Sequence, residues 1–195
     1  MMKLFRLSNE EWLKFLEKMS TEMKVVSVEN HEHPFKEMIF PPQQTLFYFR
    51  KDIPKEKPVL PESKVLYYGV KPCDAKAKKL LGCTFLSDPV DPYYQQHHMN
   101  SIVITKACDH YEPYCFCDQI GDSPGKLNGA DGILFTLPEG YHLLVNHSWL
   151  AEQLQLFGAI FNDVENESAN FNRGSMATRP SESLPIDILR EQGLK

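Results

Sequence analysis

The chain has 195 residues, 42% apolar and 24% charged, a length and composition that suit one folded domain and exclude a disordered chain. The net charge of −5 argues against nucleic acid or an anionic membrane as the main partner. No stretch reaches the ~20 apolar residues of a membrane span, and the charged N-terminus lacks the apolar core of a secretory signal. A cytoplasmic protein without a membrane partner is therefore expected.

The first third of the chain predicts one helix and two strands. A capping box at Ser8 begins an amphipathic helix over residues 9–20. Residues 23–29 and 45–50 have strand character, and the loop between them is rich in proline. Residues 51–63 hold three prolines among many charges, which predicts a connector without regular structure.

The middle of the chain predicts a β-α-β unit. Apolar, β-rich runs over residues 64–70 and 101–105 are typical of strands buried on both faces. Between them we expect a helix over residues 74–81, with Asp74 as its N-cap, and a second helix over 93–99. Strands joined in this way are expected to be parallel.

The last part of the chain predicts a hairpin and one more helix. Residues 133–137 and 141–146 flank a Pro-Glu-Gly turn, and a helix follows from Ser148. The whole pattern predicts an α/β fold with a mixed, mostly parallel sheet flanked by helices, a small hairpin and a mobile C-terminal arm. We expect a metal-binding domain over residues 1–160 and a flexible arm over residues 161–195 that can hold one short helix.

Cysteines are confined to one part of the sequence. All five fall within 45 consecutive residues, at Cys73, Cys83, Cys108, Cys115 and Cys117. An odd number in an intracellular chain argues against a disulfide framework. Clustered thiols in a reducing compartment instead indicate a metal or redox site.

Strand order predicts that four of these thiols converge. Cys73 comes three residues after the first strand of the β-α-β unit, and Cys108 comes three residues after the second. Both strands end at the same edge of a parallel sheet, where open α/β sheets usually carry their sites. Cys115 and Cys117 follow in a loop short enough to return to that edge.

The expected electrostatics favour an anionic site. Cys73 lies at the start of a helix, where the dipole and the backbone N–H groups favour a thiolate. Four thiolates around a metal cluster carry negative charge, which nearby lysines would offset, thereby raising the reduction potential. The candidate lysines are Lys71, Lys76, Lys78 and Lys79.

Four thiolates suit either zinc or an iron–sulfur cluster. The close pair is C-x-C rather than the C-x-x-C of structural zinc sites, which favours a cluster and leaves a zinc-stabilised interaction domain open. A cysteine-dependent enzyme is a further alternative, with Cys73 as nucleophile and His110 as base. That alternative gives the other three clustered cysteines no role.

Several segments together resemble one family. Residues 68–77 (YGVKPCDAKA) resemble the motif G-V-R-P-C-D-x-x-A, and residues 91–94 resemble D-x-Y-Y. Residues 108–124, with Cys115-Phe116-Cys117, are similar to C-x(n)-C-F-C-x-x-x-G-x-x-P, and residues 40–50 resemble an F-P-P…T-L-F-R-F run. The family is the iron–sulfur β subunit of cytoplasmic sulfhydrogenases together with the corresponding iron–sulfur component of anaerobic sulfite reductase, and the resemblance covers about residues 35–160.

The resemblance implies a non-catalytic electron-transfer subunit of an oxidoreductase complex. It implies one iron–sulfur cluster, [4Fe–4S] rather than [2Fe–2S], held by residues that match the family cysteines: Cys73, Cys108, Cys115 and Cys117. Its partners would be ferredoxin-like, flavoprotein, hydrogenase or sulfite reductase subunits of an anaerobe. Cys83 matches no family cysteine and is expected to be a buried thiol.

Two departures from the family pattern stand out. Lys71 replaces the usual arginine, which keeps the charge and loses the planar fork. Family members also continue into a ferredoxin-like domain with C-x-x-C-x-x-C-x-x-x-C-P runs, and this sequence contains none. The resemblance therefore implies that the ferredoxin-like part is on another chain or has been lost.

Overall fold

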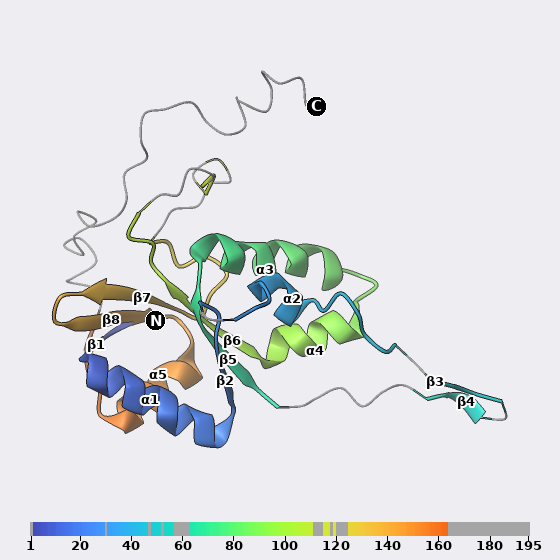
Figure 1. Ribbon diagram of the computed structural model, residues 1–195, viewed down its shortest axis with the longest axis horizontal. Helices are drawn as coiled ribbons and strands as arrows, with labels where there is room; N and C mark the ends of the chain where they lie inside the picture. The colour runs from blue at the N-terminus through green and yellow to red at the C-terminus, as the bar shows by residue number, and fades with distance from the viewer. Residues whose placement is uncertain are drawn as a thin grey trace.

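A seven-stranded mixed sheet forms the centre of the computed structural model (Figure 1). The structure describes residues 2–29, 31–46, 48–51, 53–56, 63–110, 115–117, 119 and 125–163. The strands are β1 (Lys3–Leu7), β2 (Lys24–Ser27), β3 (Tyr48–Arg50), β4 (Ile53–Glu56), β5 (Val65–Val70), β6 (Ser101–Lys106), β7 (Gly132–Leu137), β8 (Gly140–Val145) and β9 (Ile160–Asp163). The helices are α1 (Asn9–Glu22), α2 (Phe35–Ile39), α3 (Pro72–Phe85), α4 (Pro92–Asn100) and α5 (Ser148–Phe157).

The sheet has a parallel half and an antiparallel half. Its order is β2-β5-β6-β7-β8-β1-β9. Neighbours from β2 to β7 are parallel, whereas β8 pairs antiparallel with β7 and β1, and β9 pairs antiparallel with β1. Five of the seven strands therefore point the same way, which confirms the predicted mixed, mostly parallel sheet. The predicted parallel pairing of β5 and β6 and the β7–β8 hairpin are confirmed as well.

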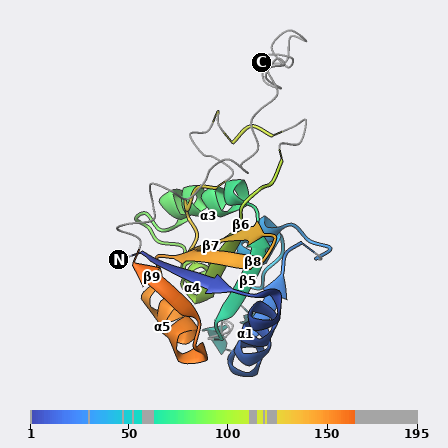
Figure 2. The same cartoon turned by 90° about the vertical axis from the view of Figure 1, so that its left-hand side faces the viewer.

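Helices cover both faces of the sheet (Figure 2). On one face, α1 and α5 bury an apolar cluster with residues of β1, β5, β6, β7 and β8. Phe5, Phe15 and Leu143 in this cluster are fully shielded from solvent. On the other face, α2 and α3 pack Phe35, Ile39 and Ala75 onto Tyr67 and Val103 of β5 and β6. The near-continuous apolar runs of β5 and β6 follow from this burial on both sides.

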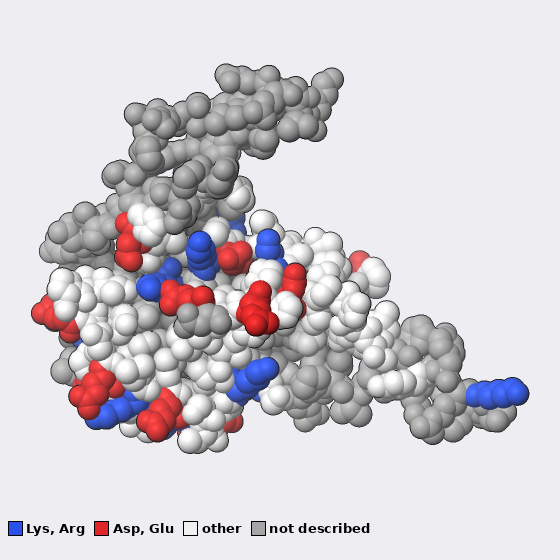
Figure 3. Space-filling view, viewed as in Figure 1, with Lys and Arg blue, Asp and Glu red and all other residues white. Residues whose placement is uncertain are grey.

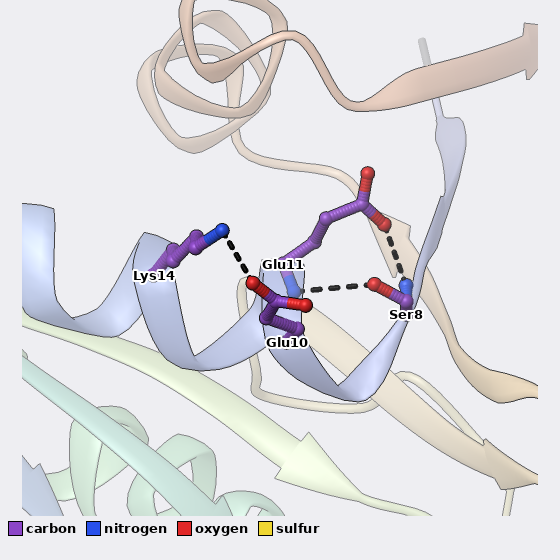
Figure 4. A network of polar contacts seen from close by, with 4 residues as sticks. All are labelled: Ser8, Glu10, Glu11 and Lys14. Carbon is purple, nitrogen blue, oxygen red and sulfur yellow. Dashed lines mark hydrogen bonds and ion pairs between the residues drawn. The ribbon is translucent and has the colours of Figure 1, made fainter.

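The predicted capping box sets the start of α1 (Figure 4). The Glu11 backbone N–H donates to Ser8 Oγ at 3.2 Å, and the Ser8 N–H donates to Glu11 Oε2 at 2.7 Å. These two bonds satisfy N–H groups that have no partner within the helix. One turn further on, Lys14 Nζ contacts Glu10 Oε1 at 2.6 Å across the exposed surface.

Several predicted boundaries were wrong. The helix α3 begins at Pro72, with Lys71 rather than Asp74 as its N-cap, because proline at the first helical position already has a helical φ. The connector predicted over residues 51–63 contains β4, which pairs antiparallel with β3 in a two-stranded sheet that extends from the main body (Figure 1). Pro54 is tolerated in β4 because this strand has a neighbour on one side only.

Besides β4, three short elements have no counterpart among the predicted ones, namely β1, α2 and β9. Two of them are explained by pairing, because β1 lies between β8 and β9 in the antiparallel half. The arm was predicted to begin at residue 161, but residues 161–163 belong to β9. The rest of the predicted arm, with its short helix, lies outside the described residues, as do the family-like Gly121 and Pro124.

Candidate metal centre

Two cysteines follow the carboxyl ends of neighbouring parallel strands. Cys73 is the second residue of α3 and lies three residues after β5 ends at Val70. Cys108 lies two residues after β6 ends at Lys106. Since β5 and β6 are adjacent and parallel, the two cysteines leave the sheet at the same edge.

A cavity of about 600 Å³ opens at this edge. It is lined by Cys73, Cys108, Cys115 and Cys117, which are the four cysteines predicted to converge. All five cysteines of the chain are thiols and none is in a disulfide. The structure therefore brings the four predicted residues to one cavity, although no group of three or more His, Cys, Asp or Glu side chains in the described part of the chain is arranged to hold a metal ion as it stands.

Cys83 lies apart from this cavity. It is in the second half of α3 and is exposed, so the expectation that it is a buried thiol was wrong. The apolar contacts of α3 with the sheet use other positions, including Ala75. As expected, Cys83 is not a member of the thiol group.

Burial decides the protonation of the two strand-end thiols. It raises the pKa of Cys108 to about 11, with the neighbouring Cys73 adding to the effect. Burial also raises the pKa of Cys73, even though the Asp74 backbone N–H bonds to its sulfur and acts in the opposite direction. The expectation of a low pKa for Cys73 at a helix start was therefore wrong, because desolvation outweighs the helix terminus. A nucleophilic Cys73 is correspondingly disfavoured.

The four thiols also interact electrostatically across the cavity. Cys73, Cys115 and Cys117 each raise the pKa of Cys108, and Cys117 raises the pKa of Cys73. Repulsion between thiolates weakens with distance, so these effects accord with the cavity that the four residues share. A cation at this place would remove the repulsion, so the donor set fits a bound metal or iron–sulfur cluster.

Among the four predicted lysines, Lys71 is the one that lines the cavity. Its charge lowers the pKa of both Cys73 and Cys108. Lys78 instead lies on the buried face of α3, where its Nζ donates to the Ser101 carbonyl at 3.4 Å and burial lowers its pKa. Lys79 Nζ donates to Asn128 Oδ1 at 3.3 Å. On the face drawn in Figure 3, acidic and basic side chains are intermixed over α3 and the neighbouring strand ends.

Histidines contribute to the cavity wall, but not those of α4. His110 lines the cavity close to Cys108, and His31 and His33 line it from the segment after β2. The His33 backbone N–H donates to His31 Nδ1 at 3.2 Å, and His33 Nδ1 lies 3.2 Å from Glu37 Oε2. These contacts give the two histidines local roles within their own segment.

Glu29, Phe35 and Lys106 also line the cavity, and sequence reasoning missed all three. One available signal was the position of Glu29, which follows β2 as Cys73 and Cys108 follow β5 and β6. A third parallel strand ending at the same edge delivers its next residues to the same place.

No helix in the described ranges combines the length and the apolar composition needed to cross a membrane.

The sequence has a curated relative. The chain is 31% identical over 138 residues to sulfhydrogenase 2 subunit beta from Pyrococcus furiosus. The match covers 69% of this chain and 39% of that protein, so the chain spans about two fifths of its relative's length. No family model matches the chain, and no solved structure gives a significant match. The identity over 69% of the chain agrees with the resemblance of its Cys-containing segments: this chain is similar to the β subunit of a sulfhydrogenase.

Proposed function

We propose that this chain binds one iron–sulfur cluster, of the [4Fe–4S] type, through Cys73, Cys108, Cys115 and Cys117. The observation that supports the proposal is the single cavity that all four thiols line. Four cysteine sulfurs are the usual ligand set of such clusters. The raised pKa values of Cys73 and Cys108 accord with a site that loses protons when a cation binds.

The cluster would supply one-electron chemistry, and the chain's own residues would hold it and shape its surroundings. Lys71 would place a positive charge beside Cys73 and Cys108. The half-buried position of all four cysteines would limit water access. Phe116, between Cys115 and Cys117, is 52% exposed and would offer a partner an approach close to the cluster.

We further propose that the chain relays electrons between partner subunits of a cytoplasmic hydrogenase-like or sulfite-reductase-like complex and has no substrate chemistry of its own. The relative's name, which describes one component of a sulfhydrogenase, supports this proposal. Ferredoxin-like or flavoprotein subunits are the expected partners, because a single cluster spans only a short part of an electron path.

The test is anaerobic reconstitution of the full chain with ferrous iron and sulfide. The expected product is brown, contains about four iron and four sulfide per chain as the cluster type requires, and gives an electron paramagnetic resonance signal after one-electron reduction. A colourless protein that takes up zinc in preference and retains neither iron nor sulfide would instead support the zinc-stabilised interaction domain. Protein that retains no metal, with one rapidly alkylated thiol at neutral pH, would support the enzyme alternative.

A further inference from the structure

The strand β5 contains an irregularity just before the cysteine site. Its pairing with β6 shifts in register between Tyr68 and Val70, and the intervening Gly69 has a φ of +74°. A bulge of this kind bends a strand and changes where the following residues point. Here the bend lies four residues before Cys73, so the conformation of Gly69 affects where Cys73 leaves the sheet.

The Glu29 side chain covers Gly69. A Cβ atom at position 69 would lie 2.8 Å from Glu29 Cγ and 3.2 Å from its Cδ. The Val28 backbone N–H also donates to the Tyr68 carbonyl at 3.0 Å, which continues the β2–β5 pairing up to this point. Glycine is therefore favoured over other residues at position 69 for two reasons. The backbone has a left-handed φ, and the Glu29 side chain leaves no room for a Cβ atom.

The Glu29 carboxylate continues across β5 to the next strand. Lys106 Nζ donates to Glu29 Oε1 at 2.9 Å. Glu29 follows β2 and Lys106 ends β6, and β5 lies between these two strands in the sheet. The ion pair thus bridges two strands that are not neighbours, and it passes over the one residue of β5 that has no side chain.

This bridge is part of the cavity wall. Glu29, Gly69 and Lys106 line the same cavity as the four cysteines. The side chains of Lys106 and Glu29 are 35% and 45% exposed, and ion pairs in such positions contribute little to folding stability. The pair joins the residue after β2 to the end of β6 across β5, so its effect is instead geometric.

From this arrangement we infer that Glu29 and Lys106 are positioning residues that set the relative placement of Cys73 and Cys108. Cys73 follows β5 and Cys108 follows β6, so a change in the spacing of those strand ends changes the separation of the two sulfurs. The inference rests on the proposed function, because it is the cluster that would require this separation. On this inference, Glu29 and Lys106 in the cavity wall set the separation of the two sulfurs, which the cysteines do not set by themselves.

The test compares cluster release in variants of the pair. Glu29→Gln and Lys106→Met should each speed the loss of iron to a ferrous chelator about tenfold, the lower end of the effect of residues that orient metal ligands. The double variant should release iron at the same rate as either single variant, because two residues that act through one contact are not additive. Lys106→Arg, which can still donate to Glu29, should release iron close to the wild-type rate.

A matched control is the Glu10–Lys14 pair on α1, which is also exposed and lies outside the cavity. Glu10→Gln makes the same charge change as Glu29→Gln and should leave iron release unchanged. Thermal unfolding of the cluster-free variants should match the wild type, which separates positioning from a general loss of stability. Wild-type release rates in Glu29→Gln and Lys106→Met, or effects that multiply in the double variant, would overturn the inference.

A second probe keeps the inference separate from the proposed function. Co²⁺ bound by several thiolates gives a thiolate-to-metal absorption band, so titration of the cluster-free chain reports whether the sulfurs can meet around one ion. The inference predicts that Co²⁺ binds about tenfold more weakly to Glu29→Gln than to the wild type. If this result is found and the wild type takes up no iron and sulfide, the inference stands and the proposed function alone fails. Equal Co²⁺ affinity, or no thiolate band in the wild type, overturns it.

Discussion

The parallel half and the antiparallel half of the sheet have different roles in this protein. In the parallel half, β2, β5 and β6 all run toward one edge, and the residues that follow them line the cysteine cavity. In the antiparallel half, β8 returns directly from β7, and β1 joins from the other end of the described chain. Strands of this half contribute Phe5, Leu143 and Val145 to the larger core.

The difference follows from how the strands are connected. A parallel pair needs a crossover, so each strand ends at the same edge and presents a separate stretch of sequence there. In an antiparallel hairpin, successive strands end at opposite edges of the sheet, so the connection brings only the residues of its own turn to an edge. The parallel half can therefore assemble a site from distant residues, and the antiparallel half chiefly supplies buried area. Four predictions test this division, from the largest effect to the smallest.

The strongest test removes a proposed ligand from the parallel half. Cys73→Ser should abolish retention of the cluster. Serine is a poor ligand for the iron of such clusters, so only three of the four proposed thiol ligands remain. Iron and sulfide analysis after anaerobic reconstitution measures the result. Cys83→Ser is the control, because Cys83 is exposed and outside the cavity. Greater cluster loss in Cys83→Ser than in Cys73→Ser would show that the ligand set is wrong.

A large change in the antiparallel half should instead reduce stability. Phe5→Ala removes a fully buried ring from β1 and should lower the free energy of unfolding by about 3–5 kcal/mol. Urea denaturation of the cluster-free chain measures the loss. Leu13→Ala on α1, where Leu13 is 65% exposed, should change stability by no more than about 0.5 kcal/mol. Similar losses in the two variants would contradict the core assignment.

The capping box predicts a smaller effect. Ser8→Ala removes the acceptor for the Glu11 N–H and should lower the free energy of unfolding by about 1 kcal/mol. Glu10→Gln, which weakens the fully exposed contact with Lys14, should leave it nearly unchanged. The same urea experiment compares both variants, and an equal or larger loss in Glu10→Gln would argue against a stabilising role for the cap.

The pH dependence of the cluster-free chain provides the finest test. The folded pKa of Cys108 is raised to about 11 from a reference value of 9.0, so the protonated thiol favours the folded state. This contribution is complete below about pH 9 and is lost as the pH rises toward 11. Stability should therefore fall over that range, and the fall should be smaller in Cys108→Ser.

Alkylation gives an independent measure of the same thiol. The rate at Cys108, followed by mass spectrometry, should keep rising with pH beyond pH 9, because the thiolate is the reactive form. A rate that levels off near neutral pH would mean a low pKa and would revive the nucleophile alternative.

Much of the parallel half was predictable because its signals are local and strong. The apolar runs of β5 and β6 and the helices between them form where their patterns predict, apart from the ends of α3, and the β7–β8 hairpin forms as predicted at the junction of the two halves. The short strands of the antiparallel half were harder: β1 has only five residues and becomes a strand by pairing with both β8 and β9. The protonation of Cys73 was mispredicted because burial, which depends on the whole fold, outweighs the nearby helix start.

The sequence by itself determined which residues could meet at the site, because cysteines placed just after two parallel strands must leave the sheet at a common edge. The tertiary structure decided what surrounds them. Glu29 reaches Lys106 only because β2, β5 and β6 are adjacent in this order and Gly69 leaves room between them. Contacts across three strands depend on strand order and register, which local sequence patterns do not specify.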